Sequence, residues 1–153
     1  MTEVEFHTGV VDKLGFACRL LRKAYRKGAR LIVTGPAPLL TALDRELWTF
    51  AERDFIPHLR LSSAVAPTLL VRTPIWLVDD DAALLDNGLP DDAPTLLVNL
   101  GSAAPANPVR FQRIIEVLST DADDQRLGRE RWRDYKASGL NVAHHPAVVS
   151  GAA

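Results

Sequence analysis

The chain has 153 residues, of which 47% are hydrophobic and 24% charged, as is typical of one soluble globular domain. No apolar run approaches the roughly 20 residues of a transmembrane helix, and the start, Met-Thr-Glu-Val-Glu, is unlike a signal peptide. Because 18 basic residues face 19 acidic ones, no overall charge attracts nucleic acid or anionic lipid. We therefore expect a cytoplasmic protein with no membrane contact, in which any charge-driven partner binds a local patch.

The first 34 residues predict a strand, a helix and a second strand. Apolar and acidic residues alternate over 2–7, which predicts a short, half-exposed strand. Over 12–27, apolar residues recur at helical spacing, Asp12 can cap the first turn and Gly28 can end the last. The aliphatic run within 29–34 predicts a strand buried on both faces, so the three elements indicate a right-handed parallel crossover.

Helices and strands continue to alternate in the rest of the chain. Helices are predicted over 39–51 and 121–138, and strands over 74–78, 95–99 and 110–118. The segment 58–72 is ambiguous, and 79–94 reads as an acidic loop. This order predicts a three-layer α/β sandwich with a mostly parallel sheet, forming a single domain over 1–143 with a flexible tail over 144–153.

No glycine-rich phosphate loop is present in the sequence. The glycines form neither G-x-G-x-x-G nor G-x-x-x-x-G-K-[ST], the loops whose amides bind phosphate. The nearest turn, 34–38, contains Pro36 and Pro38, which lack the amide hydrogens that a phosphate requires. We therefore expect no nucleotide cofactor.

Asp79, Asp80 and Asp81 follow a predicted strand, where an open parallel sheet can place metal-binding carboxylates. A magnesium-dependent phosphohydrolase using Asp79 and Asp81 is thus an alternative hypothesis. Such an enzyme also needs charged groups at neighbouring strand ends, and the next one, 99–102, is uncharged. A solvated acidic turn is the favoured interpretation.

The remaining reactive residue types form no recognised catalytic pattern. The four histidines include no H-x-x-x-H or H-E-x-x-H spacing, and no serine lies in a G-x-S-x-G turn. Cys18 lies on the apolar side of its predicted helix, as a buried thiol usually does. The sequence therefore predicts a non-enzymatic protein without a metal or cofactor.

Two features favour protein binding. Trp48 lies about 120° around its predicted helix from the apolar stripe, and with Phe55 it could form an exposed aromatic patch or instead cover the edge of the sheet. The last helix carries five basic and two acidic residues over 126–136. Its basic stripe, which suits an acidic peptide or a nucleic-acid backbone, comprises Arg126, Arg129, Arg133 and Lys136, with Trp132 beside it.

Four blocks of sequence carry a family resemblance. They are LDRELWTF at 43–50, FIPH at 55–58, TLLVNL at 95–100 and RERWRDYK at 129–136, the last followed by Gly139 and Asn141. Together they resemble the chi subunit of bacterial DNA polymerase III, and the similarity runs from about residue 3 to residue 141. Two positions depart from the pattern, since Gln125 stands in place of a lysine and Trp132 in place of a tyrosine.

The resemblance implies a Rossmann-like fold without a nucleotide loop, in a non-catalytic subunit of the clamp-loader assembly. It also implies a heterodimer with the psi subunit, bound through Trp48 and Phe55. A second surface would hold the acidic C-terminal tail of single-stranded DNA-binding protein, so that DNA is contacted only indirectly, at the bacterial nucleoid. The residues that match this tail-binding surface are Arg129, Trp132, Arg133 and Leu118, with Arg126 and Lys136 adding positive charge.

Overall fold

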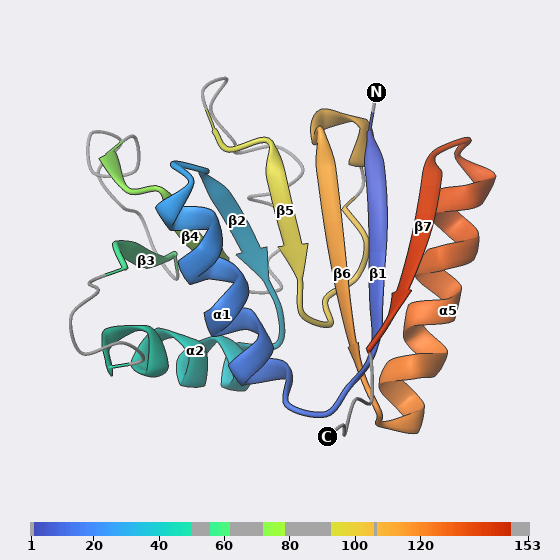
Figure 1. Ribbon diagram of the computed structural model, residues 1–153. Helices are drawn as coiled ribbons and strands as arrows, with labels where there is room; N and C mark the ends of the chain where they lie inside the picture. The colour runs from blue at the N-terminus through green and yellow to red at the C-terminus, as the bar shows by residue number, and fades with distance from the viewer. Residues whose placement is uncertain (1, 50–55, 62–71, 79–92, 106, 148–153) are drawn as a thin grey trace.

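The computed structural model describes residues 2–49, 56–61, 72–78, 93–105 and 107–147. In these ranges all strands form one seven-stranded parallel sheet, in the order β3-β4-β2-β5-β6-β1-β7 (Figure 1). The strands are β1 (Glu3–Val10), β2 (Leu31–Thr34), β3 (His58–Leu61), β4 (Ile75–Val78), β5 (Leu96–Asn99), β6 (Arg113–Ser119) and β7 (Asn141–Pro146). The helices are α1 (Lys13–Arg26), α2 (Ala37–Thr49) and α5 (Ala122–Ala137), with a 3-10 turn, η1, at Pro108–Arg110. The predicted α/β sandwich is confirmed.

The sheet is buried on both faces because successive side chains of a strand point to opposite sides. In β2, Leu31 and Val33 pack with the helices α1 and α2, whereas Ile32 joins the core on the other face. Tyr135 of α5 belongs to that second core. The helices α1 and α2 thus cover one face, and α5 covers the opposite face at the β1–β7 end of the sheet (Figure 1).

The predicted ends of the helices α1 and α5 are confirmed, whereas α2 begins two residues before its predicted start. The Asp12 carboxylate accepts a hydrogen bond from the Gly15 amide at the start of α1, and Asp121 accepts one from Asp124 at the start of α5. Gly28 and Gly139 follow the two helices with φ of 77° and 81°, a region that favours glycine.

Strand β1 differs from its prediction. It has eight residues and pairs on both sides, with β6 and with β7, so the expectation of a short, half-exposed strand is wrong. The connection from β1 through α1 to β2 is parallel, as predicted, but β5 and β6 lie between the two strands. The prediction failed because alternation in the sequence does not reveal that a later strand covers the outer edge of β1.

The structure also corrects the predicted C-terminal boundary. Strand β7 includes His144, His145 and Pro146, which we had assigned to a flexible tail, and it pairs with β1 from Glu3 to Thr8. Its side chains are mostly exposed, so it lacks the hydrophobic alternation that marks a strand. Strand β3 arises from the ambiguous segment 58–72. Residues 148–153 and the acidic segment 79–92 lie outside the described ranges.

Candidate protein-binding surfaces

The helix α5 has a buried face and a cationic face. Gly128, Arg131 and Tyr135 are buried against the sheet. At about 100° per residue, the basic residues project from the opposite half of the helix. This group, called here the α5 stripe, consists of Arg126, Arg129, Arg133 and Lys136, all of which are exposed.

The residues of the α5 stripe differ in their partners. The Arg126 guanidinium lies 3.7 Å from both Asp123 and Glu130, so two carboxylates partly neutralise its charge. Arg129 and Arg133 make no hydrogen bond or ion pair within the part of the chain that the structure describes. Both guanidinium groups are therefore available to a carboxylate from another molecule.

Trp132 borders the α5 stripe and connects it to the sheet. The centroid of its ring lies 5.0 Å from that of Phe6 on β1 and 6.0 Å from that of His144 on β7. The Lys136 ammonium lies 5.5 Å from the Trp132 ring centroid, within the range of a cation–π interaction. Trp132 is partly buried, so it both anchors α5 and leaves some aromatic surface next to the cations.

Leu118 lies beneath α5 and is only 4% exposed. It fits there because Gly128 has no side chain. A Cβ added to Gly128 would lie 2.6 Å from Leu118 Cδ2 and would clash with Cδ1 as well. In this arrangement Leu118 supports the helix from below and presents little surface to a ligand.

The substitution Gly128→Ala should therefore destabilise the protein, by roughly 1–3 kcal/mol, because the added methyl group overpacks the contact with Leu118. Chemical denaturation of Gly128→Ala, Leu118→Ala and the double variant would measure this coupling. We expect the double variant to lose less stability than the sum of the single variants, since Leu118→Ala makes room for the methyl group. Strictly additive losses would contradict the contact.

The sequence analysis missed a buried polar network beneath α5. Glu116 of β6 is fully buried and accepts hydrogen bonds from Arg131 Nε at 2.9 Å, Tyr135 Oη at 2.7 Å and Asn99 Nδ2 at 3.0 Å. Arg131, counted among the basic residues of the last helix, is 6% exposed and paired with Glu116. It therefore adds no charge to the α5 stripe. A lone glutamate within the apolar run 114–118 was the signal that could have revealed this network.

Burial raises the pKa of Glu116, while the Arg131 charge and the hydrogen bonds from Tyr135 and Asn99 oppose this shift. Burial also raises the pKa of Tyr135, and the Glu116 carboxylate raises it further. Tyr135 therefore stays a neutral hydrogen-bond donor at any physiological pH. The network fixes four side chains from β5, β6 and α5 in one arrangement.

The carboxyl ends of the strands, where open α/β sheets commonly bind ligands, contain a partly buried ion pair. Lys13 Nζ donates to the Asp124 carboxylate at 2.6 Å and to the Leu100 carbonyl at 2.9 Å. Burial alone would raise the pKa of Asp124, but hydrogen bonds from Lys13 and the Ser119 amide hold it below its ordinary value. This pair ties α1 to α5 and occupies the strand ends with a structural contact.

Asp79, Asp81 and Phe55 lie outside the described residues. The magnesium hypothesis and the pairing of Phe55 with Trp48 thus stay predictions. Within the described ranges, no three His, Cys, Asp or Glu side chains are grouped so that they could hold a metal ion. The same ranges contain no helix with the length and apolar character of a membrane span.

Trp48 lies near the end of α2 and is 56% exposed, whereas Leu40, Leu43 and Leu47 of the same helix are buried. The prediction that Trp48 lies off the core face is confirmed. Its ring centroid lies 5.0 Å from that of His58, which bonds Asp44 Oδ1 through Nε2 at 2.8 Å. Strand β3 and helix α2 thus hold a large exposed aromatic side chain in place.

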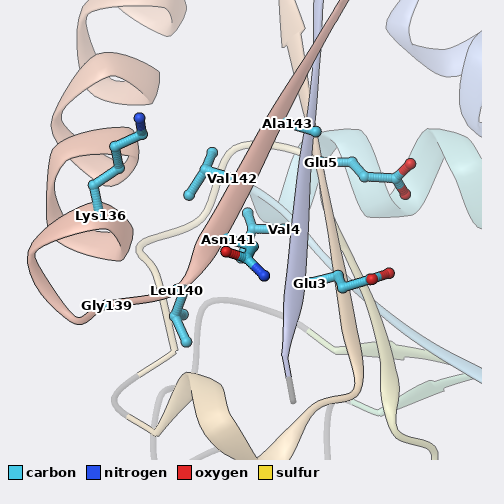
Figure 2. A pocket seen from close by; sticks show the side chains of 9 residues that line it. All are labelled: Glu3, Val4, Glu5, Lys136, Gly139, Leu140, Asn141, Val142 and Ala143. Carbon is cyan, nitrogen blue, oxygen red and sulfur yellow. The ribbon is translucent and has the colours of Figure 1, made fainter.

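A pocket of about 540 Å³ adjoins the C-terminal end of the α5 stripe. Lys136 lines the pocket, together with Leu140, which precedes β7, and Val142 of β7. Glu3 and Glu5 of β1 line it as well. Figure 2 shows the Lys136 side chain on one side of β7 and the two carboxylates extending on the far side of β1. The sequence analysis missed this pocket because it predicted neither β7 nor the pairing of β7 with β1.

These features define a Rossmann-like α/β protein with two exposed surfaces suited to protein partners, the α5 stripe and the Trp48 surface. The chain belongs to the family described as DNA polymerase III chi subunit, HolC, whose sequence model matches residues 1–143. It is also 29% identical to the DNA polymerase III subunit chi of Pseudomonas aeruginosa strain PAO1, over 95% of this chain and 96% of that protein. It is therefore related to a subunit of DNA polymerase III.

Solved structures show the same fold at low sequence identity. Domain 2 of the DEAD-box helicase Mss116p bound to an RNA duplex has a TM-score of 0.60 at 13% identity, covering 94% of this chain and 63% of that one. The C-terminal part of the Fun30 ATPase domain gives 0.57 at 14% identity, with coverages of 76% and 44%. The Hef helicase domain of Pyrococcus furiosus gives 0.56 at 13% identity, with coverages of 77% and 28%. The chain thus spans less than two thirds of each structure, and the likeness concerns the fold alone.

Proposed function

We propose that this chi-family subunit links the psi subunit of the clamp-loader complex to the acidic C-terminal tail of single-stranded DNA-binding protein. The observation that carries the proposal is the pair of exposed arginines, Arg129 and Arg133, which lie beside Trp132 without a described ion-pair partner. Family membership supports the same conclusion. In this role the subunit has no active site or cofactor, works in the cytoplasm at the nucleoid, and meets DNA through its partner.

The α5 stripe matches the chemistry of such a tail. The guanidinium groups of Arg129 and Arg133 can donate hydrogen bonds to both oxygens of the terminal carboxylate at the same time. Arg126 and Lys136 supply a more diffuse positive field for the preceding acidic residues. The exposed part of Trp132 and the adjoining pocket can receive an apolar side chain, while buried Leu118 holds the helix in place.

The psi subunit is proposed to bind the Trp48 surface, where Phe55 would supply a second aromatic side chain. Large aromatic residues dominate the energetics of protein interfaces because they bury much apolar area at low entropic cost. Trp48 lies on α2, and the α5 stripe lies on the opposite face of the sheet (Figure 1). Both partners can therefore bind at the same time, as a linking subunit requires.

Titration of a labelled acidic tail peptide onto the purified protein tests the proposal. We expect micromolar affinity that falls as the salt concentration is raised. The contacting charges are exposed, and salt screens exposed charges over a Debye length of about 8 Å at physiological ionic strength. A peptide of the same composition in scrambled order, with its C-terminal carboxylate amidated, is the control. Equal affinity for both peptides, or none for either, would refute the tail-binding role.

A further inference from the structure

The helix α1 carries a second cationic face that the proposed function does not use. Between Lys13 and Lys27 the sequence contains six basic residues and no acidic one. Lys13 forms the partly buried ion pair with Asp124 and is therefore not part of this face. The other five follow one another at steps of three and one, which places them on a single side of the helix. This group, called here the α1 face, consists of Arg19, Arg22, Lys23, Arg26 and Lys27.

Among the described residues, these five line a groove with a volume of about 250 Å³ on the α1 face. Arg19, Lys23 and Lys27 make no ion pair within the described part of the chain, whereas Arg22 and Arg26 have further contacts there. Among the described residues, Asp12 precedes the helix and Glu46 lies on α2, and the charges of both carboxylates help to raise the pKa of Cys18. The segment 19–27 thus carries five basic residues and no acidic one, in a protein whose total charge is -1.

The composition of the groove limits its partner. Its described lining contains no aromatic or aliphatic residue, because Leu20 and Tyr25 of α1 pack against the core. A peptide would find no pocket for an apolar side chain there, and a single strand would find no ring on which its bases could stack. At a rise of 1.5 Å per residue, Arg19 to Lys27 spans about 12 Å. A row of cations alone, over this length, suits the dense phosphate backbone of a duplex, with about one charge per 1.7 Å.

We propose that the α1 face binds the phosphate backbone of duplex DNA, weakly and without sequence preference. This goes beyond the proposed function, in which the chain meets DNA only through another protein. The helices α1 and α5 lie on opposite faces of the sheet (Figure 1), so the tail and a duplex do not compete. The dissociation constant should fall in the range of about 10⁻⁴ to 10⁻⁶ M at physiological salt, and affinity should rise steeply as salt is lowered.

Fluorescence anisotropy with a short labelled duplex tests this proposal. The variant Lys23→Glu/Lys27→Glu should weaken duplex binding by at least about tenfold at low salt and flatten the dependence of log K on log salt. The matched control, Arg129→Glu/Arg133→Glu, makes the same change in net charge on the other face and should bind duplex within about threefold of the unmodified protein. Thermal melting of both variants confirms that they fold.

The same two variants separate this proposal from the tail-binding one. The α5 variant should lose the acidic tail peptide and keep the duplex, while the α1 variant should do the reverse. Equal losses of duplex binding in both variants would attribute binding to net charge and overturn the proposal. Three further results would overturn the proposal. Duplex binding could be unchanged in the α1 variant, or single strands could bind more tightly than duplex. Alternatively, duplex could fail to bind while an acidic peptide binds and requires the α1 face.

Discussion

Replacing Arg129 and Arg133 by alanine should reduce affinity for the acidic tail peptide by roughly 10- to 100-fold, and Arg129→Ala alone should account for about tenfold of that loss. The reason is that hydrogen bonds to charged groups contribute about 1.5–3 kcal/mol each, at the lower end where water screens them. The two guanidinium groups are exposed and lie on the solvent side of α5. Isothermal titration calorimetry at fixed ionic strength measures the effect.

The control for this prediction is Lys23→Ala/Lys27→Ala, which removes two cations from α1 instead. It should change tail affinity by less than about threefold, because these cations lie on the other face of the sheet, beyond a Debye length of about 8 Å. An unchanged affinity in Arg129→Ala/Arg133→Ala would remove the proposed site. Equal losses in both double variants would mean that the tail senses only net charge.

The second large effect concerns the buried glutamate. Glu116→Ala should destabilise the protein by about 3–5 kcal/mol, because it leaves the Arg131 guanidinium buried and without its carboxylate. Arg131 Nη2 already has no hydrogen-bond partner among the described residues, which thus offer no spare acceptor. Glu116→Gln should cost less, since the amide oxygen can still accept a hydrogen bond from Tyr135 or Arg131. Urea denaturation followed by circular dichroism provides the free energies of unfolding.

Glu130→Ala is the matched control, because Glu130 also faces an arginine, Arg126, but both side chains are more than half exposed. Its loss should stay below about 1 kcal/mol, the usual limit for a surface pair. If Glu116→Ala were no more destabilising than Glu130→Ala, the network would not hold α5 in place. The comparison thus separates the effect of burial from the loss of one Glu–Arg pair.

The sequence predicted the elements that carry their own pattern. The strands β2 and β4 were found because aliphatic and aromatic residues fill both of their faces. The helices were found because their apolar spacing and caps agree, as at Asp12 and Gly28. Strands β3 and β7 were missed, since a short or exposed edge strand depends on a partner strand that is distant in the sequence. The local sequence pattern therefore could not predict that β7 pairs with β1.

The candidate site was predicted only in part. The spacing of the α5 stripe placed its four cations on one face, and the structure confirms their exposure. The spacing could not show that the Arg131 side chain is buried, because its partner Glu116 lies 15 residues away on a strand. Nor could it show that Leu118 is covered, since this depends on the absence of a side chain at Gly128. Both corrections follow from packing between elements.

The most direct test of a linking subunit is a bridging measurement. The psi subunit is immobilised, the chi-family protein is added, and the labelled tail peptide of single-stranded DNA-binding protein is then passed over the surface. We expect the peptide to be retained only when the unmodified protein is present. With Trp48→Ala the peptide should be lost because the protein no longer binds the psi subunit. With Arg129→Ala/Arg133→Ala the protein should still bind the psi subunit but should not retain the peptide. Peptide retained in the absence of the protein, or not retained in its presence, would contradict the linking role.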